Sequence, residues 1–174
     1  SQTSVVRINY AHHTYTDIRC FLMEEKQPQI KPSKIRITAM GILAGREYLR
    51  SQLATKLEEK FDNSSLIPDV LDRLAEENLQ SDSRFIEAFI RSRVARGQGF
   101  TRIRLDLKSR GADTALIDQL LAQADIDWFE LARDTATLKF GNDHQVDPKE
   151  KAKRMRFLQY RGFSFDQIKH ALND

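Results

Sequence analysis

The chain has 174 residues, of which 40% are hydrophobic and 30% are charged, and its mean hydropathy is −0.55. This composition is typical of a soluble globular protein and excludes a disordered chain. No apolar run reaches the length of a membrane span, and the first 25 residues lack the pattern of a secretion signal. The single cysteine, Cys20, excludes an internal disulfide and a multi-cysteine zinc site. We therefore expect a cytoplasmic protein.

The formal net charge of +3 hides charged segments that alternate in sign along the chain. Residues 82–111 sum to +5 and residues 149–162 also to +5, whereas residues 112–148 between them sum to −6. Such alternation indicates either separate faces with separate tasks or neighbouring segments that attract one another within the fold.

Residues 1–33 differ from the remainder of the chain. Two stretches around His12-His13 alternate loosely between apolar and polar side chains, a pattern compatible with a hairpin, although an N-terminal tail is the simpler interpretation. A segment that contains Pro28 and Pro32 follows and is typical of a linker.

From residue 34 onward the sequence predicts an all-α fold. Good helix formers are plentiful, whereas the whole chain holds only seven Gly and four Pro. Asp147-Pro148 is typical of a helix start, Ser164 begins a capping box, and Gly97, Gly111 and Gly162 each follow an arginine as helix stops are expected to do. The predicted helices cover residues 34–44, 47–60, 65–78, 82–96, 100–110, 113–123, 127–140, 148–161 and 165–173.

These helices fall into threes because the sequence repeats itself. Leu57, Leu107 and Leu158 are 50 and 51 residues apart, and each is followed by Ile ten residues later and by Leu fourteen residues later. The first helix of each unit is expected to pack through Ile42-Leu43, Phe85-Phe89 or Trp128-Leu131. The pattern predicts three tandem three-helix modules, at residues 34–80, 81–124 and 125–174, stacked into an elongated, curved array.

Catalytic signatures are largely missing from the sequence. Residues 97–99 are too short a glycine motif for a dinucleotide site, and the spacing of His12-His13 and Cys20 matches no common metal site. Asp125 and Asp127 precede a helix, where an N-cap explains them better than a pair of catalytic carboxylates. We expect no enzyme, no metal and no cofactor.

Two clusters of cations, in residues 82–111 and 149–162, are the stronger functional signal. Arginine dominates the first cluster, and its planar guanidinium suits phosphate and carboxylate groups. Gly97 and Gly99 lie between the two basic helices, where the backbone could approach a partner closely. The candidate contact residues are Arg91, Arg93, Arg96, Arg102, Arg104, Lys108, Arg110, Lys151, Lys153, Arg154 and Arg156.

Two interpretations of these clusters stay open. In the first, the cations form a solvated face or pair with the acidic third helices of the neighbouring modules. In the second, they bind an anionic partner, which would be DNA or an acidic protein groove. Phe100 and Tyr160 are weak candidates for base stacking, and no sequence-specific readout is expected.

Several motifs along the chain occur in a specific order. They run as Arg46-Glu47-Tyr48-x-x-x-Gln52-Leu53-x-x-Lys56-Leu57, Phe89-Ile90-Arg91-Ser92-Arg93, Gly97-x-Gly99, Arg102-Ile103-Arg104-x-x-Leu107 and Lys153-x-x-x-Phe157-Leu158-x-x-Arg161-Gly162-Phe163. This series resembles the RecX family, the regulators of the bacterial recombinase RecA, over residues 34–174. Gly41 and Gly45 depart from the family pattern, in which the first helix carries better helix formers, and residues 1–33 match nothing in it.

The resemblance implies a non-enzymatic regulator of DNA repair and recombination. Such a protein binds the RecA nucleoprotein filament and inhibits filament extension, ATP hydrolysis, strand exchange and coprotease activity. It implies contacts first through residues 91–108 and second through residues 151–156, with weak non-specific DNA binding, no membrane and a monomeric state. The alternatives are a non-sequence-specific DNA-binding protein that acts without RecA, or a helical-repeat scaffold whose basic helices pair internally.

Overall fold

The structure is a computed structural model that describes residues 29–142 and 146–172. The chain divides into two units between Lys31 and Pro32, and the second unit holds all the helices of the described part. These nine helices are α2 (Pro32–Leu43), α3 (Arg50–Lys60), α4 (Ile67–Glu76), α5 (Asp82–Ala95), α6 (Phe100–Ser109), α7 (Thr114–Gln123), α8 (Trp128–Phe140), α9 (Pro148–Arg161) and α10 (Phe165–Ala171). The described ranges contain no strand, and the predicted all-α fold is confirmed. The hairpin expected around His12-His13 lies outside the described residues.

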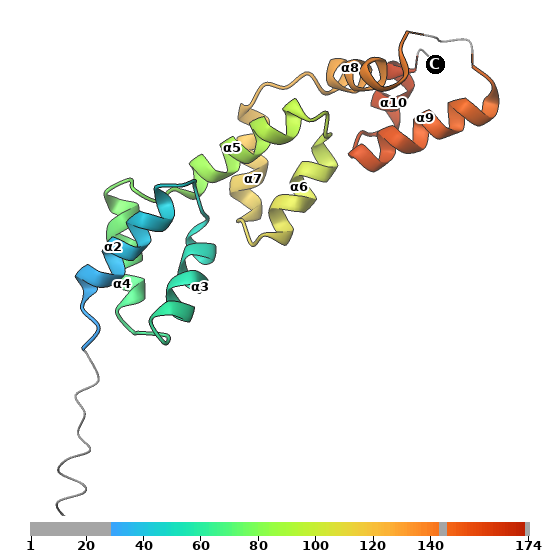
Figure 1. Cartoon of the computed structure of the whole chain (residues 1–174). Coiled ribbons are helices and arrows are strands. Elements are labelled where there is room, and N and C mark those ends of the chain that lie inside the picture. The colour runs from blue at the N-terminus through green and yellow to red at the C-terminus, as the bar shows by residue number, and fades with distance from the viewer. Residues whose placement is uncertain (1–28, 143–145, 173–174) are drawn as a thin grey trace, which may run out of the picture. The chain divides into compact units, whose positions relative to one another are not determined.

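The helices pack in three groups of three (Figure 1). Helix α2 packs against α3 and α4, α5 packs against α6 and α7, and α8 packs against α9 and α10. We call these groups module 1 (α2–α4), module 2 (α5–α7) and module 3 (α8–α10). The predicted tandem three-helix organisation is confirmed.

The repeated leucines form the centre of each module. Leu57, Leu107 and Leu158 lie on the second helices, and each is 0% exposed. The isoleucines that follow them lie on the third helices and are at most 4% exposed. Full burial of such a side chain contributes about 1.5–3 kcal/mol. The repeat therefore marks the contact between the second and third helix of each module.

The first helices contact the cores mainly through small buried faces. Their buried apolar residues are pairs that are four positions apart: Ile35 and Ala39 in α2, Ile86 and Ile90 in α5, and Ala132 and Ala136 in α8, where Thr135 is buried as well. The predicted residues Ile42-Leu43, Phe85-Phe89 and Trp128-Leu131 are only partly buried. Two residues one turn apart make a narrow inner face, and the larger side chains lie beside it.

The helix ends follow the predicted signals with two exceptions. The side chain of Asp147 accepts the backbone N–H of Glu150, and Ser164 forms its capping box with Gln167. Gly97, Gly111 and Gly162 have φ of 70°, 84° and 91°, the left-handed conformation expected at helix stops. Helix α2 begins at Pro32, which was assigned to the linker, because proline suits a first helical turn.

The second exception is α3, which begins at Arg50 and not at residue 47. Leu49 is extended, with φ −61° and ψ 146°, and its side chain is fully buried in the core of module 2. The residues before α3 therefore reach the next module, and one side chain of module 1 is part of the core of module 2.

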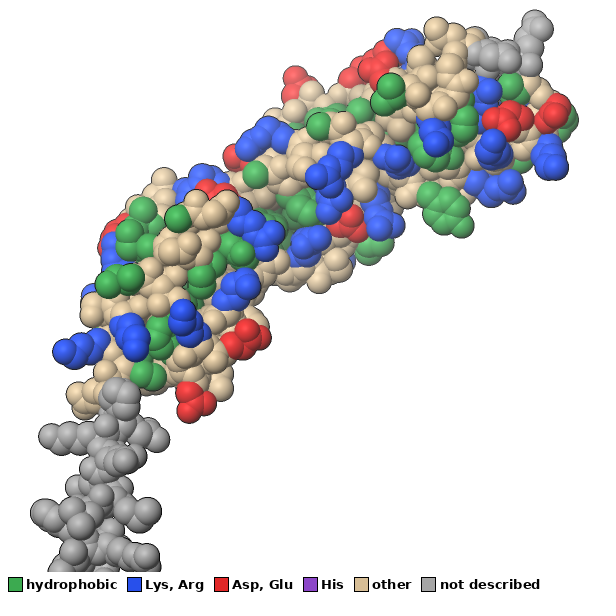
Figure 2. All heavy atoms as spheres, in the orientation of Figure 1, with side chains coloured by type: hydrophobic (Ala, Val, Ile, Leu, Met, Phe, Trp, Pro, Cys, Tyr) green, Lys and Arg blue, Asp and Glu red, His purple; other side chains and the backbone are tan. Residues whose placement is uncertain are grey.

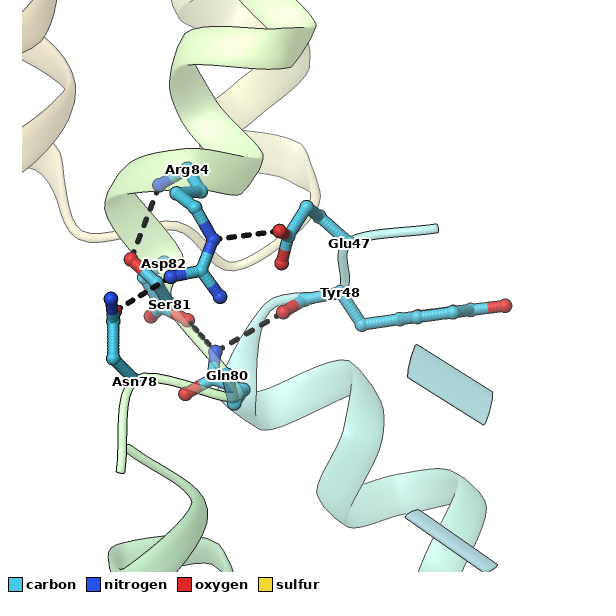
Figure 3. A network of polar contacts seen from close by, with 7 residues as sticks. All are labelled: Glu47, Tyr48, Asn78, Gln80, Ser81, Asp82 and Arg84. Carbon is cyan, nitrogen blue, oxygen red and sulfur yellow. Dashed lines mark hydrogen bonds and ion pairs between the residues drawn. The ribbon is translucent and has the colours of Figure 1, made fainter. Parts of the chain in front are cut away.

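A polar network reinforces this junction (Figure 3). The Arg84 Nε donates to Glu47 Oε1 at 2.7 Å, and its Nη1 donates to Asn78 Oδ1 at 2.6 Å. The buried Gln80 amide donates to the backbone carbonyl of Tyr48 at 3.1 Å and to Asp82 at 2.7 Å. Residues 47 and 48 are thus held in place by residues of the segment that enters module 2.

Modules 2 and 3 meet where α6 begins and α9 ends. The backbone N–H of Gly99 donates to the carbonyl of Arg161 at 2.7 Å, and that of Thr101 donates to the carbonyl of Gly162 at 3.2 Å. The Phe100 ring lies edge-on to Trp128, with centroids 5.8 Å apart. The free N–H groups at one helix start are satisfied by the free carbonyls at another helix end.

Candidate functional site

Three cations of module 2 are exposed and carry no ion pair. Arg91 lies on α5, Arg96 directly after it, and Lys108 on α6. No carboxylate of the described residues lies within 4.0 Å of their side-chain nitrogens. These three side chains keep a full positive charge that faces solvent.

Two further cations of module 2 are held by an aromatic ring. The guanidinium carbons of Arg93 and Arg110 lie 4.6 Å and 5.2 Å from the centroid of the Phe89 ring. A ring orients a guanidinium without neutralising it, because it supplies a quadrupole and no charge. Phe89, which was predicted to be a core residue, therefore supports charged groups at the surface.

Arg104 and Arg102 are instead engaged inside module 2. Arg104 donates two hydrogen bonds to Asp118 of α7, from Nε to Oδ1 at 2.6 Å and from Nη2 to Oδ2 at 2.9 Å. This bond lowers the pKa of the Asp118 carboxyl and raises the pKa of the Arg104 guanidinium. The Arg102 Nε lies 3.1 Å from Asp106 on the same helix. Arg104 thus pairs with the third helix of its own module, and Arg102 pairs with a carboxylate of its own helix. Among the described residues, neither pairs with the third helix of a neighbouring module, which was the pairing that the sequence left open.

In module 3 most candidate cations are also engaged. Arg154 is only 8% exposed, bonds Glu150 at 3.3 Å, and lies 5.1 Å from the centroid of Phe140. The Lys153 Nζ lies 3.2 Å from Glu150, and its hydrogen bond is the main cause of a lowered pKa of the Glu150 carboxyl, with Arg154 adding to it. Lys151 is half-buried, and Arg156 is exposed.

The glycines between α5 and α6 do not face a partner. Gly99 is buried, and its backbone N–H donates a hydrogen bond to the backbone carbonyl of Arg161. A β-carbon on Gly97 would lie 2.7 Å from the Thr135 hydroxyl of module 3. The close backbone approach predicted here is real, but it occurs within the chain. Of the two stacking candidates, Phe100 packs on Trp128, whereas Tyr160 is 81% exposed.

The sequence did not reveal a hollow of about 390 Å³ between modules 1 and 2. Its lining includes Arg46, Tyr48, Gln52, Lys56, Phe85 and Arg110, and we call it the module 1–2 hollow. The motif that begins at Arg46 brings a cation and a ring together in the sequence. Arg110 is distant in sequence, and only the fold brings it to the same place.

Figure 2 shows that Lys and Arg side chains lie over all three modules and exceed Asp and Glu on the face drawn. In the described ranges, no three or more His, Cys, Asp or Glu side chains are grouped to hold a metal ion. None of the described helices is both long and apolar enough to cross a membrane.

The three-helix modules are joined in tandem by Leu49, which inserts into the core of module 2, and by the paired helix ends of modules 2 and 3. Such an arrangement defines a helical-repeat protein. Family models agree in detail: RecX, second three-helix domain, matches residues 81–121, and RecX, third three-helix domain, matches residues 125–172. The chain belongs to the RecX family, and the resemblance seen in its motifs is confirmed.

Characterised relatives support this assignment over most of the chain. The chain is 44% identical over 142 residues to a regulatory protein RecX of Pseudomonas putida, covering 82% of this chain and 91% of that protein. It is 41% identical over 137 residues to the regulatory protein RecX of Halorhodospira halophila, and the match covers 79% of this chain and 85% of that protein. Both relatives carry the name of a regulatory protein.

Solved structures show the same fold. The crystal structure of RecX from Lactobacillus salivarius superposes with a TM-score of 0.70 at 21% identity, covering 82% of this chain and 94% of that one. A second crystal structure of regulatory protein RecX gives a TM-score of 0.69 at 18% identity, and the match covers 96% of this chain and 83% of that one.

Proposed function

We propose that the chain is a non-enzymatic regulator that binds RecA–DNA filaments and inhibits filament extension and the ATP hydrolysis, strand exchange and coprotease activity of RecA. The observation that carries this proposal is the set of unpaired cations on module 2, at Arg91, Arg96 and Lys108. A nucleoprotein filament presents a regular row of phosphates, and cations that neutralise phosphates gain affinity by releasing counterions.

The tandem modules suit such a partner. A filament repeats one subunit along its length, and a chain of repeated modules can contact successive repeats. Linked contacts raise the overall affinity well above that of any single contact. A monomer in the cytoplasm would be sufficient for this task.

Internal pairing narrows the contact surface. Arg102, Arg104, Lys153 and Arg154 have carboxylate partners in the fold, and we assign them a structural role. The remaining contact candidates are Arg91, Arg93, Arg96, Lys108, Arg110 and Arg156, with Lys151 beside them.

The test is ATP hydrolysis by RecA on single-stranded DNA, with the chain titrated against it. Inhibition at far less than one chain per RecA is the expected result, since one regulator then affects many filament subunits. Inhibition that appears only when the chain saturates the DNA would favour the alternative of a DNA-binding competitor. No inhibition at any ratio would overturn the proposal.

A further inference from the structure

The module 1–2 hollow combines cations with aromatic rings, as the Arg154–Phe140 and Arg161–Phe157 contacts also do in module 3. It differs from those contacts because its lining comes from two modules. Arg46 and Lys56 lie over the ring of Tyr48, with the Arg46 guanidinium carbon 4.5 Å and the Lys56 Nζ 5.7 Å from its centroid. Arg110 enters from module 2 and lies over Phe89, whose ring stacks with Phe85 at 6.2 Å. The hollow therefore draws its lining from both modules.

The charges of this hollow are available for a ligand. No ion pair joins Arg46, Lys56 or Arg110 to a carboxylate of the described chain, although Glu59 also lines the hollow. Aromatic rings hold the three cations in position and leave their charge unneutralised. The lining therefore attracts an anion.

The segment that carries Arg46 and Tyr48 is fixed before any ligand arrives. Glu47 receives a bond from Arg84, and the backbone carbonyl of Tyr48 receives one from Gln80. In Figure 3 the Tyr48 ring points away from this polar network. A group that is already held in place loses little conformational entropy on binding.

The layered arrangement favours a nucleotide over a simple anion. A guanidinium plane is a surface on which nucleobases stack, and Arg46 on Tyr48 gives such a plane with an aromatic support beneath it. The hollow volume of about 390 Å³ falls within the usual range of ligand sites. Lys56 and Arg110 line the same hollow and supply positive charges for the phosphates of such a ligand.

A single strand fits these features better than a duplex does. A duplex offers its phosphates to a protein but keeps its bases stacked inside, whereas a single strand exposes both. The rings and guanidinium planes that line the cationic hollow would find no exposed base to stack on in a duplex.

We propose that the module 1–2 hollow binds single-stranded DNA, with a base stacked on the Arg46–Tyr48 layer and phosphates bound by Lys56 and Arg110. Arg91, Arg96 and Lys108 of module 2 do not line the hollow, whereas Arg110 lines it and is also a contact candidate of the proposed function. The inference deepens the proposed function, since a RecA filament contains single-stranded DNA, but its test needs no RecA.

The first experiment measures binding of the full chain to a labelled oligothymidine by fluorescence anisotropy over a series of salt concentrations. Lys56→Gln and Arg110→Gln each remove one phosphate contact, and each is expected to reduce the salt slope by about 0.7. Arg46→Gln removes the stacking plane and should weaken binding with a smaller change in the salt slope. The triple variant should reduce the salt slope by at least about 1.4. At low salt the triple variant should bind at least about tenfold more weakly.

Lys169→Gln is the matched control. The Lys169 Nζ lies 5.7 Å from the Phe165 ring centroid, the same distance as Lys56 from Tyr48, but it belongs to module 3. This variant should bind the oligothymidine as the unaltered chain does. Equal losses in the Lys56→Gln and Lys169→Gln variants would overturn the site, because charge alone would then explain them. Circular dichroism checks that the helices of each variant are retained.

A second experiment reports on stacking. An oligonucleotide with 5-iododeoxyuridine, irradiated in the complex, is expected to cross-link to Tyr48, as mass spectrometry of the peptides would show. The cross-link should be lost in Tyr48→Leu, which keeps an apolar side chain. A cross-link confined to other parts of the chain would overturn the stacking assignment.

A duplex of equal length distinguishes the two forms of DNA. Weaker binding of the duplex, with little sensitivity to Arg46→Gln, is expected. Equal affinity for both forms, with equal loss in that variant, would overturn the single-strand assignment. These results leave the proposed function untouched, because that proposal fails only if RecA itself is not inhibited.

Discussion

A β-carbon built on Gly99 would lie 2.5 Å from the carbonyl oxygen of Gly162, because α6 begins against the end of α9. The same contact brings the backbone of Arg102 against Gly162. The Arg161 side chain adds a bond to the carbonyl of Arg96. The junction between modules 2 and 3 thus fixes the backbone that carries several candidate cations.

Replacing Gly99 by alanine should therefore destabilise the chain. Its φ of −84° suits any residue, so the effect is steric only, against the backbone of Gly162 and Phe163. We expect the free energy of unfolding to fall by about 1–3 kcal/mol, as for other overpacked sites. Urea denaturation followed by circular dichroism measures it.

Gly41→Ala is the control for this change. Gly41 lies in α2, is exposed, and has no atom within 4 Å of a built β-carbon. Alanine there should stabilise the chain by about 0.5–1 kcal/mol, since glycine is a poor helix former. A Gly99→Ala variant as stable as Gly41→Ala would show that the helix ends do not meet as described.

Replacing a core leucine by alanine should destabilise the chain much more than replacing an exposed one. Leu107→Ala removes a fully buried side chain from the cluster that also holds Leu49 of module 1. We expect a loss of about 2–5 kcal/mol in the free energy of unfolding. Leu138, which is 91% exposed, should tolerate alanine within about 0.5 kcal/mol. Thermal unfolding of both variants measures the difference, and equal melting temperatures would contradict the assigned core.

Much of the fold could be predicted from the sequence because the repeat is a packing repeat. Leu57, Leu107 and Leu158 recur at equal spacing since each fills the same place between two helices. The first helices were predicted less well, because large aromatic side chains such as Phe89 look like core residues. In the structure the buried face of each first helix consists mainly of Ile and Ala. The Phe89 ring lies beneath the guanidinium groups of Arg93 and Arg110.

The candidate site could be predicted only in outline. Arg104 and Lys108 are one helical turn apart and look equivalent in the sequence, but Arg104 alone is bonded to Asp118 on α7. That difference depends on how α6 and α7 face one another. The module 1–2 hollow likewise depends on a tertiary contact that places Arg110 near Tyr48.

Stability should fall in acid partly through Asp118. Its carboxyl pKa is lowered in the folded chain, chiefly by the hydrogen bond from Arg104, so the ionised form favours folding. This contribution is fully present above the unfolded pKa of about 4 and is lost as the pH falls through the lower folded pKa. Melting temperatures of the unaltered chain should therefore drop more between neutral pH and about pH 3 than those of Asp118→Asn. Parallel curves would contradict this role of the pair.

Variants of unpaired and of paired cations in module 2 should affect RecA inhibition and stability differently. A variant with Arg91→Glu, Arg96→Glu and Lys108→Glu should keep its helical content, since these side chains are exposed and have no ion pair with a described residue. Its melting temperature should fall only slightly, because Lys108 attracts Asp118 without a hydrogen bond to it. Its half-inhibitory concentration in RecA ATP hydrolysis should rise by at least about tenfold, because three phosphate contacts become repulsive. Arg104→Glu should instead lower the melting temperature, as it places a carboxylate against Asp118.

A control with the same charge change decides whether position or net charge causes the loss. Lys34→Glu, Lys60→Glu and Lys169→Glu reverse three exposed lysines outside module 2. If the module 2 surface makes the contact, this variant should inhibit RecA almost as the unaltered chain does, with a smaller effect at higher salt. If both triple variants lose inhibition equally, long-range charge is responsible and the contact assignment is wrong.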